Sequence, residues 1–434
     1  MKDQASLNRP ATDGVADKKI ASAGGNPPSS PDSAPLAAAQ SQLAAKLHAE
    51  SIVVDGHVHI TERVFHEGID PWQAQTTGLF DYARAKQGGL NVVIHALYLE
   101  DAYNRYNYTI KHACRLLEIF FRTLEANKDK MELALTSADI RRIVADGKMA
   151  QVLGLEGGFD MEGDLEVIRF FYRAGVRMIQ FVHHRMTSGF ADSYGDEVQV
   201  WNGINERGRT IVRELNRLGI LIDISHATEA TQAQVIETSE APVVASHVGA
   251  KHFSNHLQNL SDELLKAVAA KGGMIGIHGH GSFLAQKYWD WRRFQNETAS
   301  WRATRSMELT RPALDYHCDH ITELDSLMHE EWLNGPGFWY SMPWKESVPR
   351  DALVPNMDDF IATIDYMVNL LGEDHVGIGL DLMWGTYWLR DFDATSYPRI
   401  TEGLVAKGYC AGTVRKILGE NWLRVLDTAK VAVK

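Results

Sequence analysis

The feature that most constrains the fold is an alternation of short apolar runs with amphipathic segments. Eight apolar runs follow the first fifty residues: SIVVDGHVH, GLNVVIHALY, AQVLGLEGG, VRMIQFVHH, GILIDISHA, APVVASHVG, GGMIGIHGH and DHVGIGLD. Between them, in segments such as residues 109–126 and 358–372, apolar residues recur at the three- and four-residue steps of a helix face. Apolar strands that alternate with helices are typical of a parallel sheet covered by helices. Eight repeats predict an α/β fold, a closed (β/α)8 TIM barrel, with an open doubly wound sheet as the alternative.

Two regions depart from this alternation. Residues 1–45 are rich in Ala, Ser, Pro, Gly and Asp, and a stretch such as GGNPPSSPDSAP cannot bury apolar surface, so we expect a disordered N-terminal tail. Residues 46–434 would then form the barrel. Between the seventh and eighth runs, about residues 281–355 form a long insertion that carries six tryptophans. It would be a lid, a substrate wall or a dimer contact above the catalytic face, or it would pack on itself.

Composition excludes several classes of function. The formal charge is −12 and no basic stripe is present, which argues against nucleic acid as a partner. The three cysteines are far apart, so any metal must be held by histidine and carboxylate. No apolar run is long enough to span a membrane, and neither a signal pattern nor an anchor is visible. We therefore expect a cytoplasmic protein, or a periplasmic or secreted one if a leader has been removed.

Metal-binding and proton-transferring side chains stand at the ends of the predicted strands. Because the carboxyl ends of all strands of a parallel barrel meet on one face, we expect these side chains to converge. A single histidine at a strand end is more often structural than functional, but such groups at nearly all eight ends are hard to produce by chance. The residues are His57, His59, His95, Glu156, His183, His226, His247, His278, His280 and Asp381.

This set of side chains predicts a metal-dependent hydrolase. His57 and His59 are two residues apart on a strand, so their side chains point to the same side. Imidazole and carboxylate together suit zinc or another borderline divalent ion, and five or six such ligands suggest two ions that share a carboxylate. Glu156 is the natural bridge, and Asp381 would handle the proton while two metals activate a hydroxide.

The order and surroundings of these residues resemble the membrane dipeptidase (renal dipeptidase) family, peptidase family M19 of the amidohydrolase-like barrels. The resemblance extends from about Ala49 to Leu426. It is carried by VDGH, GLEGG, GVRMIQFVHH followed by FADS, RELNRLGILIDISHA, APVVASH, DHVGIGLD and GLVAKGYCAGTVRKILGENWLRVL. The resemblance implies a zinc-dependent dipeptidase that acts on a short peptide or other small molecule, and it implies a homodimer.

The family's functional residues can be carried over where the motifs match. The resemblance implies that His57 and His59 bind the first zinc and that Glu156 bridges both ions. His226 and His247 would bind the second zinc. It also implies that Asp381 is the catalytic acid and base, and that His183 holds the oxygen of the scissile carbonyl and stabilises the developing oxyanion.

Two positions depart from the family pattern. The family usually begins with HxD, whereas His59 replaces the aspartate here, which removes a negative charge from the site. Eleven residues after His247, the family has an arginine that helps hold the substrate, followed by asparagine. This chain has Gln258 and Asn259. We expect Gln258 at the substrate-binding position, and it cannot offer the charged fork that binds a carboxylate.

Three functions are therefore open. The first is a dipeptidase-like hydrolase of a peptide or amide C–N bond with two divalent ions, most simply zinc. The second is a tailoring enzyme that acts on a modified peptide or on a siderophore or natural-product intermediate, with copper or iron as alternative metals. The third is a binding protein on a retained barrel, which the complete set of ligands and Asp381 disfavours.

Overall fold

The structure is a computed structural model that describes residues 33–100, 103, 108–157, 164–183, 186–196, 198–299, 324–326, 329, 353–382 and 389–429. It divides into two compact units, residues 1–39 and 40–434, and the whole sheet belongs to the second. Helix α1 spans Ser33–Glu50, so residues 33–45, which we expected in a disordered tail, are helical. Their sequence is rich in Ala and Leu, which favour helices. Residues 1–32 and most of the predicted insertion lie outside the described residues.

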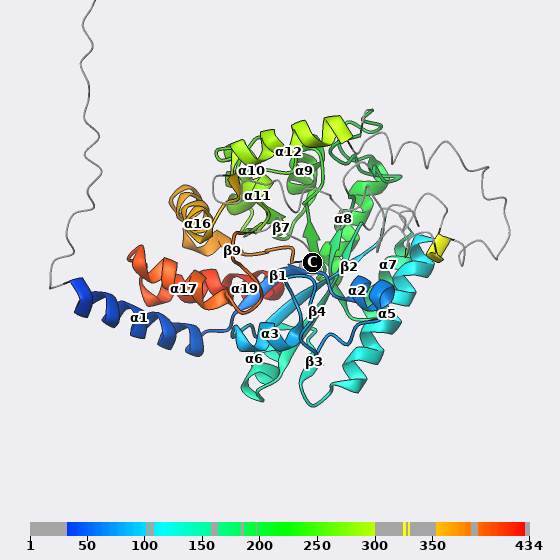
Figure 1. Ribbon diagram of the computed structural model, residues 1–434. Helices are drawn as coiled ribbons and strands as arrows, with labels where there is room; N and C mark the ends of the chain where they lie inside the picture. The colour runs from blue at the N-terminus through cyan, green and yellow to red at the C-terminus, as the bar shows by residue number, and fades with distance from the viewer. Residues whose placement is uncertain are drawn as a thin grey trace, which may run out of the picture. The chain divides into compact units, whose positions relative to one another are not determined.

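Among the described residues, nine parallel strands form one sheet (Figure 1). The sheet order is β1-β2-β4-β5-β6-β7-β8-β9, and the short β3 pairs with the beginning of β4. The eight strands of the main path overlap the eight predicted runs, whereas β3 has only three residues, too few for a visible pattern. The strands are β1 (Val54–Val58), β2 (Val92–Tyr98), β3 (Met131–Leu133), β4 (Met149–Glu156), β5 (Val176–Gln180), β6 (Leu221–Asp223), β7 (Val243–Val248), β8 (Met274–Ile277) and β9 (Val376–Ile378).

The sheet closes on itself through the residues that follow β9. Val58 forms a parallel bridge with Leu382. The backbone N–H of Asp381 donates to the carbonyl oxygen of His57 at 3.0 Å, and that of His59 donates to Leu382 at 3.3 Å. The predicted closed TIM barrel is confirmed, and the open doubly wound sheet is not formed.

A buried carboxylate stabilises this closure. Asp55 Oδ1 accepts the backbone N–H groups of His57 at 3.2 Å and of Leu380 at 3.0 Å. Its Oδ2 accepts the hydroxyl of Tyr397 at 2.6 Å. One side chain therefore joins the first strand, the last strand and the helix that carries Tyr397. Burial raises the pKa of Asp55 to about 6, against the lowering effect of Tyr397 and the two backbone donors.

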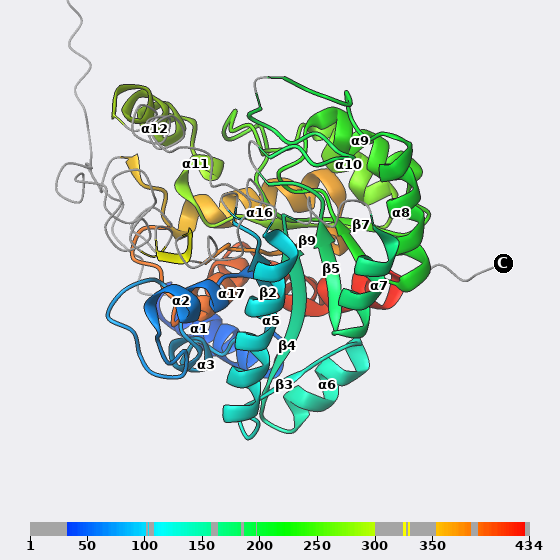
Figure 2. The same ribbon diagram turned by 90° about the vertical axis from the view of Figure 1, so that its right-hand side faces the viewer.

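Helices surround the sheet (Figures 1 and 2). The predicted helix over residues 109–126 is confirmed to the residue as α5, and the one over 358–372 is shifted by one residue as α16. The helical elements after α1 are α2 (Thr61–Glu67), α3 (Tyr82–Gln87), α5 (Thr109–Ala126), α6 (Ser137–Ala145), α7 (Leu165–Arg173), α8 (Glu206–Leu218), α9 (Glu229–Thr238), α10 (Asp262–Ala270), α11 (Gly281–Leu284), α12 (Gln286–Ala299), α16 (Met357–Leu371), η3 (Glu373–His375), α17 (Tyr397–Ala406), α18 (Ala411–Arg415), the π-helical turn η4 (Lys416–Glu420) and α19 (Asn421–Thr428).

Side-chain caps determine where several of these helices begin. Asn205, Thr228, Ser261 and Asn356 each accept a backbone N–H from the first turn of the helix that follows. Such a cap satisfies a donor that has no partner within the helix. The caps Asn205 and Thr228 end the loops that follow β5 and β6, and these two loops carry His183 and His226. Within the described residues, no helix is long and apolar enough to cross a membrane.

Trp422 fills the barrel at the end opposite to the carboxyl ends of the strands. Its ring is completely buried and belongs to a core cluster with residues that begin the strands, such as Val54 of β1 and Met274 of β8. Its Nε1–H donates to the carbonyl oxygen of Ile378 at 2.9 Å. A Cβ at Gly56 would lie 1.9 Å from the indole ring, so glycine is required there.

Truncating Trp422, the plug at this end of the barrel, should destabilise the protein without changing a residue of the catalytic face. Trp422→Ala removes a fully buried indole and leaves a cavity, which costs about 3–5 kcal/mol of unfolding free energy. Thermal unfolding followed by circular dichroism measures the loss. Phe170, whose side chain is 48% exposed, supplies the control. An equal loss of stability in Phe170→Ala would contradict the plug assignment.

Candidate metal centre

The closed barrel brings the side chains at the carboxyl ends of its strands together. His57 lies in β1 and His59 just after it, Glu156 is the last residue of β4, and His247 lies in β7. The seven predicted metal and catalytic residues form one cluster of side chains at 14% exposure or less. They are His57, His59, Glu156, His183, His226, His247 and Asp381.

Glu156 lies at the centre of this cluster, and its two oxygens face different histidines. Oε2 lies 3.1 Å from Nε2 of both His57 and His59. Oε1 lies 3.2 Å from His226 Nε2 and 3.7 Å from His247 Nε2. The carboxylate therefore divides four histidines into two pairs, which is the arrangement required of a bridging ligand between two ions.

Asp381 borders the first pair. Its Oδ1 lies 3.0 Å from His59 Nε2 and 3.8 Å from His57 Nε2, and its Oδ2 lies 3.1 Å from His278 Nε2. Of the four non-glycine residues with positive φ in the described part of the chain, two are Asp381 (55°) and His226 (63°). Such a backbone costs about 1–3 kcal/mol and is concentrated at functional sites.

His183 borders the second pair. Its Nε2 lies 3.7 Å from Glu156 Oε1, and its ring packs against His226 with centroids 4.2 Å apart. The ring of Tyr98 also packs against it, with centroids 4.7 Å apart. The imidazole of His183 is thus held beside the shared carboxylate.

A single serine supports histidines of both pairs. Ser246 Oγ donates to Asp223 Oδ2 and lies 2.7 Å from His247 Nδ1 and 3.3 Å from His57 Nδ1. One hydroxyl has one proton to give and two lone pairs to accept with. It therefore accepts N–H from Nδ1 of the two imidazoles, which directs Nε2 of each into the site. Ser225 Oγ also donates to Asp223, at 2.8 Å.

The charges of the cluster favour a bound cation. Burial alone would raise the pKa of the Glu156 carboxyl, but His57 and His59 outweigh it and hold that pKa well below its usual range. Burial also opposes the ionisation of Asp381, yet His278 and His59, which face its two oxygens, hold its pKa well below the usual value. Both carboxylates are therefore anionic at neutral pH.

The donor atoms fit divalent metal ions. His57 Nε2 and His59 Nε2 lie 3.2 Å apart, and His226 Nε2 and His247 Nε2 lie 2.9 Å apart. At these distances the two nitrogens of each pair can bind the same cation, and imidazole nitrogens are zinc ligands. Within the described residues, three groups have ligand atoms within 4.8 Å of one another: His57–His59–Glu156, Glu156–His183–His226 and His57–Asp223–His247. No hydrogen-bond partner of Asp381 Oδ1 is found within the described residues.

One sequence expectation has a different outcome. His95 was expected on the catalytic face, but its ring hydrogen-bonds to Tyr82 and, at 3.0 Å, to Gln151 Oε1. Burial lowers its pKa to about 4. His95 is therefore a satisfied structural histidine. The supporting contacts of Ser246 and Asp223 were not predicted from the sequence, although a serine stands directly before His247.

The amide of Gln258 is occupied at both ends. Its Nε2 donates to the carbonyl oxygen of His247 at 2.8 Å, and its Oε1 accepts the hydroxyl of Tyr194 at 3.1 Å. Tyr194 in turn stacks on the ring of His226 with an interplanar angle of 11°. A role of Gln258 in substrate binding stays a prediction, and Tyr194 is the side chain through which it would act.

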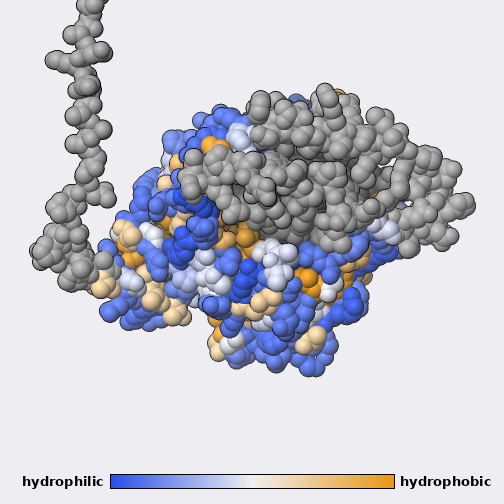
Figure 3. Space-filling view, viewed as in Figure 1, coloured by the Kyte–Doolittle hydropathy of each residue, from blue (hydrophilic) through white to orange (hydrophobic). Residues whose placement is uncertain are grey.

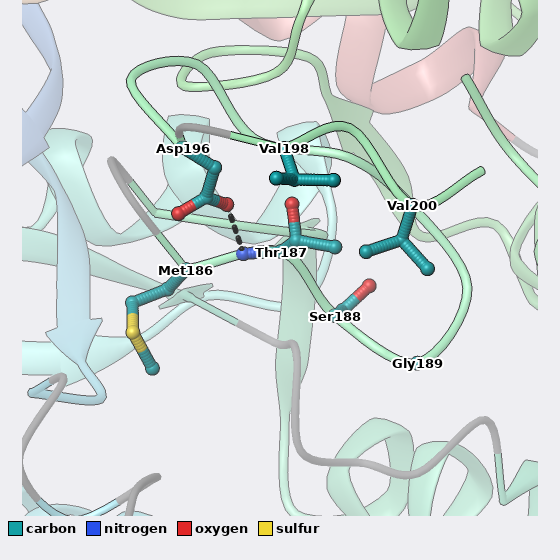
Figure 4. Close-up of a pocket in the computed structure, with 7 residues that line it drawn as sticks. All are labelled: Met186, Thr187, Ser188, Gly189, Asp196, Val198 and Val200. Carbon is teal, nitrogen blue, oxygen red and sulfur yellow. Dashed lines mark hydrogen bonds between the residues drawn. The ribbon is translucent and has the colours of Figure 1, made fainter. Parts of the chain in front are cut away.

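The loop between β5 and α8 carries a pocket of about 560 Å³, which is lined by residues that follow His183 in the chain (Figure 4). Asp196 Oδ2 accepts the backbone N–H of Thr187 at 2.9 Å, and the side chains of Val198 and Val200 are largely exposed. None of the candidate metal ligands lines this pocket. Its lining residues are Met186, Thr187, Ser188, Gly189, Asp196, Val198 and Val200.

Comparison with known proteins agrees with this geometry. The sequence profile of membrane dipeptidases, peptidase family M19, matches residues 41–434. The chain belongs to peptidase family M19. Dipeptidase tcpJ of Claviceps purpurea is 25% identical to this M19 chain over 386 residues, which are 86% of this chain and 76% of tcpJ. Dipeptidase verJ of Clonostachys rogersoniana is 23% identical over 402 residues, 89% of this chain and 86% of verJ.

Solved structures share the fold. The probable dipeptidase PvdM from Pseudomonas aeruginosa superposes with a TM-score of 0.69 at 20% identity, covering 91% of this M19 chain and 99% of PvdM. A metallo peptidase from Rhodobacter sphaeroides, bound to a phosphinate mimic of the dipeptide L-Ala-D-Ala, gives 0.65 at 22% identity and covers 88% and 100%. The family expected from the sequence motifs is confirmed.

Removing the serine that supports both pairs should weaken metal binding. In Ser246→Ala, the imidazoles of His57 and His247 lose the acceptor that orients them. Loss of such a partner typically lowers metal affinity about 10–100-fold. Competition with a chromophoric chelator measures this affinity. Ser225→Ala is the matched control, because it removes a hydrogen bond to Asp223 and one from the backbone N–H of His247 at 3.4 Å but no acceptor of an imidazole. An equal effect in both variants would contradict the assignment.

Proposed function

We propose that this M19 chain hydrolyses a peptide or amide C–N bond with two zinc ions. The division of four histidines by the two oxygens of Glu156 carries the proposal. His57 and His59 would hold one ion, His226 and His247 the other, and Glu156 would bridge them. Ions of this kind polarise a carbonyl and lower the pKa of water to near neutrality. Four imidazoles and one carboxylate suit zinc better than magnesium or calcium.

Asp381 would move the proton. A water oxygen forms the new bond to the carbonyl carbon, and its proton passes to Asp381 Oδ1. When the C–N bond breaks, Asp381 Oδ1 returns the proton to the departing nitrogen, which leaves as a neutral amine. The position of Asp381 supports this role, because its Oδ1 lies at the first histidine pair while its Oδ2 is held by His278.

His183 would stabilise the carbonyl oxygen as it becomes negative. Its ring packs against Tyr98 and His226 and lies beside Oε1 of Glu156. A ring N–H that points at the developing oxyanion contributes most in a site from which water is excluded. The low exposure of His183, 8%, supports such a site.

The substrate would be a short peptide or a related small molecule. The arginine that the family uses to hold the substrate is replaced by Gln258, whose amide is turned toward His247 and Tyr194. This favours a second candidate, hydrolysis of a modified peptide that has no free C-terminal carboxylate, as in a tailoring step. The homodimer implied by the resemblance stays a prediction, which light scattering would test.

Replacing Asp381 with asparagine should abolish turnover and leave the fold intact. Asparagine tolerates positive φ but cannot take a proton, so we expect hydrolysis of Ala-Ala to fall about 10²–10⁴-fold. Metal content and melting temperature should remain. Asp391→Asn changes the other described aspartate at positive φ, an exposed one. It should keep activity within about twofold. Turnover retained in Asp381→Asn would refute the proton role.

Amidation of the peptide should separate the two substrate classes. Because no guanidinium stands at position 258, Ala-Ala and its C-terminal amide should have kcat/KM values within about tenfold of each other, a difference of about 1.4 kcal/mol. Steady-state kinetics with both peptides measures the ratio. A much larger loss on amidation would show that another group recognises the carboxylate and would favour a free dipeptide.

A further inference from the structure

His278 is a buried histidine of the catalytic cluster to which the family resemblance assigns no role. It directly follows β8 and is 3% exposed. Its Nε2 lies 3.1 Å from Asp381 Oδ2, the oxygen that faces away from the first histidine pair. The contact therefore joins His278 to the side chain on which proton transfer depends.

The hydrogen bonds around His278 define its tautomer. The backbone N–H of His280 donates to His278 Nδ1 at 3.0 Å. A ring nitrogen that accepts a hydrogen bond carries no proton, so the proton of the neutral imidazole resides on Nε2. Burial lowers the pKa of His278, against the raising effect of Asp381, which agrees with a neutral ring. His278 is thus a donor to Asp381 and has no lone pair left on Nε2 for a metal ion.

Both partners are held by the backbone of the barrel. The N–H of His278 donates to Val248 at 3.0 Å, and the N–H of Gly279 donates to Leu380 at 3.2 Å. The ring of Phe283 covers the imidazole with centroids 3.8 Å apart. Asp381 is tied to β1 by its own N–H, which donates to His57 at 3.0 Å. The contact between the two side chains is therefore built into the closed sheet.

We propose that His278 is the positioning residue of Asp381. Its Nε2–H holds Oδ2 and thereby turns Oδ1 toward the histidine pair, where the proton is taken from water and later returned to the amine. His278 itself neither gains nor loses a proton: the O–H bond of water breaks, an O–H bond forms on Asp381, and His278 keeps its N–H throughout. This inference rests on the proposed function for the reaction, while the tautomer can be tested without it.

Two substitutions separate positioning from packing. His278→Gln retains an N–H at the same number of bonds from Cα, whereas His278→Leu retains bulk and loses the donor. With Ala-Ala as the probe, we expect kcat of His278→Leu to fall about 10–100-fold, with KM changed less than about threefold. His278→Gln should recover most of kcat. Metal content, measured by elemental analysis, should equal that of the wild type in both variants.

Several outcomes would overturn the proposal. Loss of an ion in His278→Leu would make His278 a metal ligand. Equal kcat in the Gln and Leu variants, or wild-type kcat in His278→Leu, would show that the N–H is not used. If the wild type does not hydrolyse Ala-Ala, the proposed substrate class fails, and nitrogen NMR of the histidine-labelled, zinc-loaded protein decides the inference. We expect an Nε2–H tautomer for His278, and an Nδ1–H tautomer or an imidazolium ring would refute it.

Discussion

The parallel contact between Val58 and Leu382, which closes the barrel, is the interaction on which the rest of the site depends. It places the end of β1 beside the residues that follow β9. His59 Nε2 and Asp381 Oδ1 therefore lie 3.0 Å apart, although more than 300 residues separate them in the chain. Asp55 stabilises the same closure with three hydrogen bonds. An open sheet would leave the first histidine pair without the carboxylate of Asp381 beside it.

Closure also concentrates charge and strain in one place. Glu156 and Asp381 are kept anionic by the histidines that face them, although burial opposes both charges. His226 and Asp381 adopt backbone angles that cost free energy. Such costs persist only where the surrounding structure enforces them. The N–H of Asp381 is held by the carbonyl oxygen of His57, and the carbonyl oxygen of His226 accepts the N–H of Tyr194.

The sequence predicted the elements whose pattern is periodic and missed those whose role depends on neighbours in space. The eight apolar runs and α5 were found because burial imposes a regular spacing. Residues 33–45 and β3 were not, because helix propensity and a three-residue pairing leave little signal. His57, His59 and Glu156 were visible at strand ends, yet His95 at another strand end turns to Gln151. The pairing of Ser246 with Asp223 and of His278 with Asp381 requires coordinates, because each joins distant parts of the chain.

The central claim is that Glu156 divides the site between two metal ions. Elemental analysis of metal per chain tests it most directly, on the wild type, on His59→Ala and on Glu156→Ala. We expect about two ions per chain in the wild type and about one in His59→Ala, which loses a ligand of one ion only. We expect fewer than one in Glu156→Ala, which loses the bridge. One ion per chain in the wild type, unchanged by His59→Ala, would contradict the account.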